Sequence, residues 1–202
     1  MTFVLDFNYP PADPAPVFLA WFDEAKRLPT PNPNAVYLAT VDADGRPSAR
    51  TVLLRAVDAH GAVFFTNRRS RKGLGIETHH RAALLFHWDP LDRQVRIEGT
   101  VTHTTDAESD AYFARRPRSS QINAWASEQS QPVEDRRALE AMASAVEQRF
   151  AGMPVPRPPH WGGYRVALDR IEFWQGDKFR LHDRIVYVRD EHGDYAVDRL
   201  CP

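Results

Sequence analysis

One segment of the chain alternates between apolar and polar residues, and it most constrains the fold. Within residues 93–104, RQVRIEGTVTHT, the apolar side chains of Val95, Ile97 and Val101 alternate with the polar ones of Gln94, Arg96 and Glu98. Successive side chains of a β-strand point to opposite faces, so this pattern predicts a strand with one buried face.

Similar apolar runs on both sides of this segment predict further strands, at 35–42, 47–58, 61–67, 81–88, 164–175, 184–190 and 195–200. The Asp44-Gly45 pair predicts a hairpin between the first two runs, and Gly193 predicts a turn between the last two. Within 164–175 the apolar residues change parity after Leu168, which predicts a bulge near Asp169 and Arg170.

Four segments have helical spacing instead: 16–27, 70–79, 105–116 and 132–150. Ser70 is a predicted N-cap, and Thr105 with Glu108 predicts a capping box. These predicted strands, in two blocks with helices between them, indicate a mainly β fold, an antiparallel barrel with helical insertions. We expect an extended N-terminal arm over 1–15, which is rich in proline, and a single domain over 16–202.

The charge and cysteine content exclude several classes of function. The 26 Lys and Arg nearly balance the 27 Asp and Glu, which argues against a nucleic-acid or membrane-surface binder. Cys201 is the single cysteine, so we expect no internal disulfide and a cytoplasmic location. The chain shows no signal peptide, no apolar membrane span, no zinc spacing and no GxSxG motif. Gly73 and Gly75 do not continue as GxGxxG, since position 78 is Thr.

The segment 112–130, YFARRPRSSQINAWASEQS, concentrates positive charge in a chain that is otherwise balanced. Arg115, Arg116 and Arg118 lie within four positions, after Tyr112 and before Ser120. The cluster fits a solvated helix end, where cations are favoured. It fits equally an anion pocket, because guanidinium forks pair with phosphate oxygens and hydroxyls supply further hydrogen bonds.

Three more clusters admit the same two interpretations. Arg50 and Arg55 flank the strand residues of RTVLLR, and Arg71 with Lys72 lies at a predicted strand-to-helix turn. Helix N-termini bind phosphate through their backbone N–H groups. In EFWQGDKFRLHDR (172–184) an aromatic residue and several possible cations surround one hairpin, an arrangement that suits a flat, charged ligand. Taken alone, each of the first two clusters fits a solvated basic loop better than a phosphate site, and the third also fits an ordinary hairpin with surface charge.

Taken together, these segments resemble the pyridoxine/pyridoxamine 5′-phosphate oxidase family. The resemblance runs from about residue 12 to the C-terminus, through RTVLL, FFTNRRSRK, LDRQVRIEG, YFARRPRSSQINAWAS, WGGYRV, IEFWQG, RLHDR and DRLCP. It implies an FMN-binding split barrel, active as a homodimer with the flavins at the subunit interface. It also implies oxidation of the 4′ carbon of pyridoxine or pyridoxamine phosphate by the flavin, which O2 reoxidises to give H2O2.

The resemblance also implies a role for individual residues. FMN would be held by Arg50, Thr51, Val52, Leu53, Leu54, Arg55, Phe65, Thr66, Arg71, Lys72, Gln94, Gln129, Ser130, Trp174 and Arg184. The substrate would be held by Arg55, Tyr112, Arg116, Ser120, Arg180, Leu181 and His182, with Arg180 and His182 over the reacting ring and in the catalytic role. Some residues of the flavin site would come from the partner chain, and no metal is implied.

Two departures from the family pattern bear on the substrate. Arg55 stands where the family usually has Lys, and the chain begins with MTFVLDFNYPPADP in place of the family's usual N-terminal segment, whose arginine and tyrosine help to close over the substrate. Two other functions stay open. One is a related flavin oxidase of another ring system, such as a phenazine precursor, and the other is a flavin-binding protein without turnover. The intact YFARRPRSSQ motif favours a phosphorylated substrate.

Overall fold

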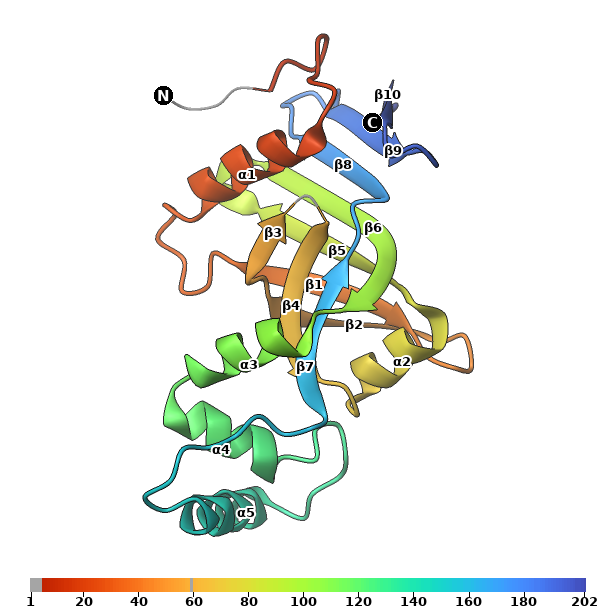
Figure 1. Cartoon of the computed structure of the whole chain (residues 1–202). Coiled ribbons are helices and arrows are strands. Elements are labelled where there is room, and N and C mark those ends of the chain that lie inside the picture. The colour runs from red at the N-terminus through yellow and green to blue at the C-terminus, as the bar shows by residue number, and fades with distance from the viewer. Residues whose placement is uncertain (1–4, 59) are drawn as a thin grey trace.

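The computed structural model describes residues 5–58 and 60–202, and a curled antiparallel sheet of ten strands forms its centre (Figure 1). The strands are β1 (Ala35–Val41), β2 (Pro47–Leu53), β3 (Ala56–Asp58), β4 (Gly61–Asn67), β5 (Arg81–Trp88), β6 (Arg93–His103), β7 (Trp161–Val166), β8 (Arg170–Gln175), β9 (Asp183–Arg189) and β10 (Tyr195–Arg199). Their main order is β10-β9-β8-β6-β5-β1-β2, while β4 pairs with β3 and β7, and β7 also with β6. The predicted mainly β fold with helical insertions is confirmed.

The long strand β6 belongs to both parts of the sheet. Residues 93–98 pair with β8, residues 101–103 pair with β7, and β5 runs along the opposite edge. Its inward residues Val95, Ile97 and Val101 are buried, as the alternation predicts. The change of partner falls at Gly99, where an added Cβ would overlap the backbone carbonyl of Ala167. This close approach lets the sheet curl upon itself.

The predicted bulge within 164–175 is wrong, because the segment forms two separate strands. β7 pairs with β4 and the end of β6, and β8 pairs with the start of β6 and with β9. Between them, the Asp169 carboxylate accepts hydrogen bonds from the backbone N–H and the hydroxyl of Thr100, at 2.7 and 2.9 Å. The change of parity therefore marks a crossing from one part of the sheet to the other.

The predicted strand 47–58 is likewise divided. β2 pairs with β1, whereas β3 pairs with β4. At the break, the Leu54 N–H donates to the carbonyl of Asn34 and the Arg55 N–H donates to that of Val63. Arg50 therefore lies on β2, and Arg55 lies in the connection between β2 and β3.

The helices are α1 (Pro14–Ala25), α2 (Arg71–His79), α3 (Asp106–Ala114), α4 (Arg118–Ala126) and α5 (Arg136–Arg149). The Ser70 cap and the Thr105–Glu108 capping box are confirmed. The first helix begins two residues earlier than predicted, because the Asp13 side chain accepts from the N–H of Ala15. α4 was not predicted, since its short sequence has no apolar periodicity.

The predicted extended arm lies partly outside the described residues, which begin at residue 5. Most residues of its described portion, 5–13, are exposed, but several contacts join it to the rest of the protein. Leu5 is buried in the main core and Phe7 packs against it. The hydroxyl of Tyr187 donates to the carbonyl of Pro11 at 3.0 Å.

Two apolar clusters hold these elements together. In the larger, Phe18 and Trp21 of α1 pack edge-on against Phe86 and Phe173 of the sheet. The smaller joins α3, α4 and the segment after α5 to the start of β7: Phe113, Ile122, Phe150, Val155 and Trp161. These three helices lie at the end of the sheet opposite α1 (Figure 1). Of the predicted apolar stripe on α5, Leu139 and Met142 stay exposed.

No helix among the described residues is both long and apolar enough to cross a membrane.

We expect Gly99→Ala to destabilise the fold by roughly 1–3 kcal/mol, as overpacked sites do. The added Cβ would meet backbone atoms of Ala167, which cannot move aside as a side chain can. Thr102→Ala, at an exposed position of the same strand, is the control and should change stability by less than about 0.5 kcal/mol. Urea unfolding followed by circular dichroism measures both. Equal stability of the two variants would show that the close approach at Gly99 is unimportant.

Candidate functional site

A first group of cations gathers where β4 turns into α2. The turn is fixed by Ser70, whose hydroxyl caps the helix, and by Gly73, where a Cβ would overlap the Arg68 carbonyl. This geometry directs Lys72, in the first helical turn, into the protein interior, where it is 8% exposed. The local sequence thus buries a charged amine in the first turn of α2.

The buried Lys72 ammonium has neutral partners only. Its Nζ donates to the hydroxyls of Thr66 and Ser70 and to the Oε1 of Gln129, at 3.0–3.1 Å. Among the described residues no carboxylate pairs with it. Burial, with a smaller effect from the charge of Arg50, lowers the pKa of Lys72 to about 8. A buried cation without a counter-ion is costly, and an anionic ligand would remove that cost.

Arg50 and Arg71 add two charges beside Lys72. The Arg50 guanidinium donates to the hydroxyls of Thr40 and Ser48, and burial together with the charge of Arg71 lowers its pKa. Arg71 pairs with Asp42 at 2.7 Å, and its backbone N–H donates to the hydroxyl of Ser130. The three side chains carry one carboxylate between them, so the group has an excess of positive charge.

A second cationic group surrounds a stack of aromatic rings. Tyr112 stacks on Phe65 with ring centroids 4.3 Å apart, and Trp161 stacks on the same ring at 5.4 Å. The Arg55 guanidinium lies 5.3 Å from the centre of the Tyr112 ring, and that of Arg116 lies 4.8 Å from Trp161. Cations over aromatic faces are attracted by the ring quadrupole.

Arg116 is only partly satisfied by these contacts. Its Nη1 is buried without a hydrogen-bond partner among the described residues, and no carboxylate there pairs with it. Burial lowers its pKa, and the nearby charge of Arg55 acts in the same direction. A buried guanidinium nitrogen without a hydrogen-bond partner favours the binding of an anion from solution.

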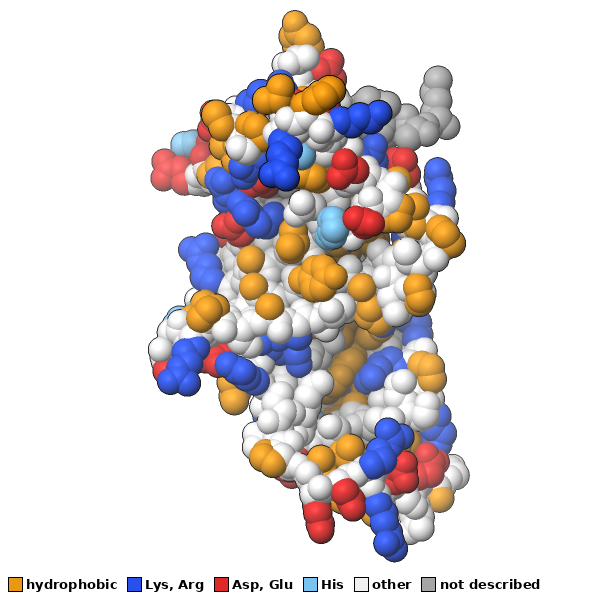
Figure 2. Space-filling view, turned by 180° about the vertical axis from the view of Figure 1, so that it is seen from behind, with side chains coloured by type: hydrophobic (Ala, Val, Ile, Leu, Met, Phe, Trp, Pro, Cys, Tyr) orange, Lys and Arg blue, Asp and Glu red, His pale blue; other side chains and the backbone are white. Residues whose placement is uncertain are grey.

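Lys72 of the first group and both arginines of the second line two connected hollows in the surface, whereas Arg50 and Arg71 line neither. Figure 2 shows a hollow in its lower half, with apolar side chains on the floor and basic ones beside it. One hollow, of about 400 Å³, reaches Ser120 and Asn123 of α4. The other, of about 230 Å³, reaches Arg55, Lys72 and the exposed side of β2. They share five lining residues: Phe65, Thr66, Arg116, Gln129 and Trp161. Lys72 and Arg116, two cations without a carboxylate partner among the described residues, thus line one cavity with aromatic side chains in its wall.

Most of the residues assigned by resemblance to this region meet there. Thr51, Val52, Leu53 and Arg55 line the smaller hollow, together with Lys72 and Tyr112. Leu54 differs, because its side chain is buried in the main core. Ser130 does not line either hollow and contacts the site through the backbone of Arg71.

A third group of the assigned residues lies elsewhere on the molecule. Gln94, Trp174 and Arg184 are neighbours across β6, β8 and β9, and the Trp174 ring lies 4.7 Å from that of His182. The β8–β9 loop carries Arg180, with a positive φ of 61°, and Leu181, which is 73% exposed. In Figure 1 these strands lie far from α4, and none of these residues lines the two hollows. A single chain does not bring the groups together.

Sequence reasoning missed several residues of the site, among them Trp161, Asp42 and the Asn123 side of the larger hollow. Trp161 supplies a wall of both hollows, but a lone tryptophan at the start of a strand carries no periodic signal. Asp42, which binds Arg71, was treated only as the end of a strand before a hairpin. Among the described residues no three His, Cys, Asp or Glu side chains gather as a metal would require.

Comparison with known families covers nearly the whole chain. The family described as "Pyridoxamine 5'-phosphate oxidase" matches residues 22–150, and the "Pyridoxine 5'-phosphate oxidase C-terminal dimerisation region" matches residues 161–202. A curated protein of Rubrobacter xylanophilus named pyridoxine/pyridoxamine 5′-phosphate oxidase is 58% identical over 95% of this chain and 88% of its own length. One of the same name from Myxococcus xanthus is 56% identical over 95% and 93%.

Solved structures agree with the fold. PhzG from Burkholderia lata, crystallised with tetrahydrophenazine-1-carboxylic acid, superposes with a TM-score of 0.90 at 32% identity, covering 98% of both chains. A pyridoxamine 5′-phosphate oxidase-related, FMN-binding protein from Nostoc punctiforme has a TM-score of 0.74 at 17% identity, covering 96% of this chain and all of its own. The predicted split-barrel architecture is confirmed by these likenesses.

We expect sulfate, a divalent anion that does not titrate in this range, to bind more weakly as the pH rises through about 8. The reason is that Lys72, whose pKa is about 8, loses the proton that attracts the anion. At pH 9 the affinity should be roughly tenfold below its value at pH 7. Isothermal titration calorimetry of the ligand-free protein measures this affinity.

The Lys72→Met variant should bind sulfate weakly at every pH. The Lys178→Met variant, changed on the exposed β8–β9 loop, should show the same fall in affinity with rising pH as the unmodified protein. A pH-independent affinity in the unmodified protein would contradict the assignment.

Proposed function

The chain belongs to the pyridoxamine 5′-phosphate oxidase family, and on that premise we propose that it is an FMN-dependent oxidase of pyridoxine 5′-phosphate and pyridoxamine 5′-phosphate. The product would be pyridoxal 5′-phosphate, with O2 as electron acceptor and H2O2 as by-product. The proposal adds the cofactor, the substrate and the roles of individual residues to the family membership.

One observation carries the proposal: two separate cationic groups lie at one aromatic-walled cavity, and Lys72 and Arg116 lack carboxylate partners among the described residues. Two bound phosphates would satisfy both. FMN and a phosphorylated vitamer each contribute one phosphate and one flat ring, so the pair of ligands matches the charges and the shape. Charge-assisted hydrogen bonds to phosphate are stronger than neutral ones.

In this proposal the first group holds the FMN phosphate. Arg50, Arg71 and the Lys72 ammonium would contact its oxygens, while Thr66 and Gln129, already bound to Lys72, would orient that amine. The exposed backbone of β2 would line the flavin ring. When bound, the flavin supplies the redox chemistry, accepting a hydride from the 4′ carbon and passing electrons to O2.

The second group would hold the substrate phosphate. Arg116 would donate through its unpartnered Nη1, and the hydroxyls of Tyr112 and Ser120 would complete the grip. Arg55 stands close enough to Tyr112 to contribute a second guanidinium. Anchoring the phosphate away from the reacting carbon fixes the ring against the flavin, and such positioning contributes a large share of catalysis.

The third group requires a second copy of the chain. Arg180, His182, Trp174 and Arg184 all lie within the matched dimerisation region, on strands distant from the cavity. We infer that a homodimer brings these residues to the partner's cavity, with Arg180 and His182 over the substrate ring. The β8–β9 loop, where Phe179 and Leu181 are both exposed, is available for that contact.

A second candidate function is oxidation of a phenazine precursor. The likeness to PhzG, at a TM-score of 0.90, favours it. The second cationic group favours the phosphorylated vitamers. Its Arg116 Nη1 is buried without a partner among the described residues, so a ring without a phosphate would bind less well.

The direct test is to load the protein with FMN, exclude oxygen, add pyridoxamine 5′-phosphate and record the flavin spectrum. Rapid bleaching followed by recovery in air is the expected result. A protein that binds FMN but stays yellow would exclude this substrate, and bleaching by a reduced phenazine precursor instead would support the second candidate. Bleaching by neither compound would support a flavin-binding protein without turnover, and failure to bind flavin would exclude all three functions.

We further expect Arg116→Gln to raise the KM for pyridoxamine 5′-phosphate about 10- to 100-fold, since it removes a charge-assisted contact of roughly 1.5–3 kcal/mol. Arg115→Gln is the matched control: it removes the same charge one residue away, from an exposed side chain bound only to the Ala111 carbonyl. Its KM should change less than about twofold. Steady-state peroxide production measures both. Equal effects of the two substitutions would show that Arg116 acts only through general charge.

A further inference from the structure

Arg71 is held by a carboxylate in a defined orientation. Its Nε and Nη2 both donate to Oδ2 of Asp42, at 2.8 and 2.7 Å. This leaves Nη1 without a partner among the described residues. The side chain itself is 58% exposed, so few packing contacts restrict it. The ion pair with Asp42 is therefore the main restraint on where the guanidinium points.

Asp42 is itself fixed on more than one side. It follows β1, where its N–H donates to the carbonyl of Arg46 and its carbonyl accepts from Gly45. The same carbonyl lies 2.9 Å from Nε2 of His79, at the end of α2. The hairpin and the helix thus hold this residue in place. Its carboxylate, 21% exposed, is a rigid anchor for a flexible arginine.

A carboxylate beside a phosphate site has two opposing effects. Its negative charge repels the incoming anion. Its ion pair orders an arginine whose long free side chain would otherwise lose rotamer entropy on binding. Solvent around Arg71, whose side chain is 58% exposed, screens the first effect, whereas the ordering acts through direct contact.

We propose that Asp42 is a positioning residue that prearranges Arg71 for the FMN phosphate, so that this carboxylate strengthens the binding of an anion. The inference rests on the proposed function, because it takes Arg71 to contact that phosphate. The opposite role, a resident counter-ion that the phosphate must displace, would make removal of the carboxylate tighten binding. The two roles therefore predict changes of opposite sign.

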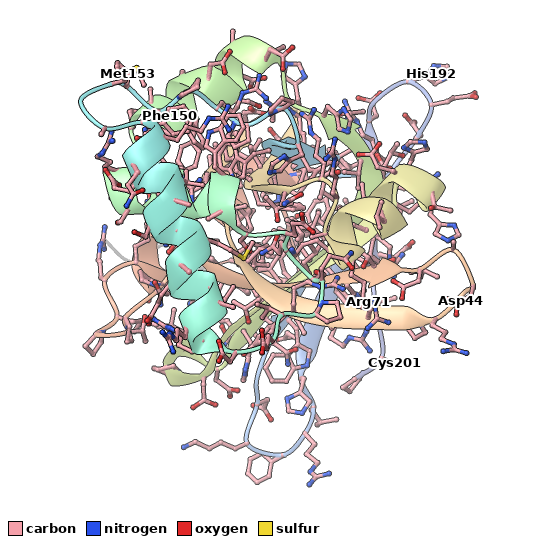
Figure 3. The ribbon with its side chains drawn as sticks, turned by 90° about the horizontal axis from the view of Figure 1, so that it is seen from below. Asp44, Arg71, Phe150, Met153, His192 and Cys201 are labelled. Atoms are coloured by element: carbon pink, nitrogen blue, oxygen red, sulfur yellow. The ribbon has the colours of Figure 1, made fainter. Side chains whose placement is uncertain are left out.

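The chain offers a matched control in Asp44. It lies two residues further along, at the tip of the same hairpin, and pairs with the exposed Arg46 (Figure 3). Its charge reaches Arg71 through space without any contact. Asp44→Asn therefore removes one nearby negative charge and leaves the Arg71 geometry unchanged. Asp42→Asn removes a negative charge and also the ion pair that orients Arg71.

The experiment titrates the flavin-free protein with FMN and with riboflavin, following the quenching of flavin fluorescence. Asp42→Asn should weaken FMN binding about 5- to 10-fold and leave riboflavin, which has no phosphate, within about twofold. Asp44→Asn should leave FMN affinity unchanged or slightly higher. In an Arg71→Gln background, Asp42→Asn should cause no further loss, because the residue acts through Arg71. Circular dichroism checks the folding of each variant, and Asp42→Ser replaces Asp42→Asn if the latter does not fold.

Three results would overturn the inference while leaving the proposed function in place. They are unchanged or tighter FMN binding by Asp42→Asn, an equal loss for FMN and riboflavin, and an undiminished loss in the Arg71→Gln background. Failure of the unmodified protein to bind FMN would instead overturn the proposed function and this inference with it.

Discussion

The burial of Lys72 without a carboxylate is the constraint on which the site depends. Removing an ammonium from water is unfavourable, and three neutral acceptors compensate only in part, as the lowered pKa shows. The cap at Ser70, the close turn at Gly73 and the Gln129 amide all serve to hold this charge in place. In the second cationic group, Arg116 likewise has a buried nitrogen, Nη1, without a hydrogen-bond partner among the described residues. Both costs fall when anions bind.

The sheet explains why these charges lie where they do. Since β6 pairs with β8 through its first half and with β7 through its second, one strand connects two differently oriented sets of strands. The set with β4 and β7 carries the cavity, and the set with β8 and β9 carries Trp174 and Arg184. These groups lie in different regions of one chain, so under the proposed function a second copy of the chain would complete the site.

Local patterns predicted most of the elements, because they depend on near neighbours. The alternation in 93–104, the Ser70 cap and the Thr105–Glu108 box all appear in the structure. Periodicity did not predict the breaks between strands at Leu54 and Asp169, where the chain passes from one part of the sheet to the other. At Asp169 the reason is that a change of pairing partner and a bulge both shift the parity of the apolar residues. The clustering of Lys72, Arg116 and Trp161 depends on contacts between distant segments, and only the family resemblance indicated most of it. The Asp42–Arg71 pair had no such signal.

The sharing of β6 between two sets of strands also restricts how the length of the chain can vary. One residue inserted before Gly99 would reverse the faces of Val95 and Ile97 and displace the pairing with β5 and β8 together. The hairpin tip at Gly45 has no such restriction, because nothing lies within 4 Å of an added Cβ there. Insertions and deletions among relatives of this chain should therefore concentrate at hairpin tips and be excluded from β6, whatever substitutions that strand accepts.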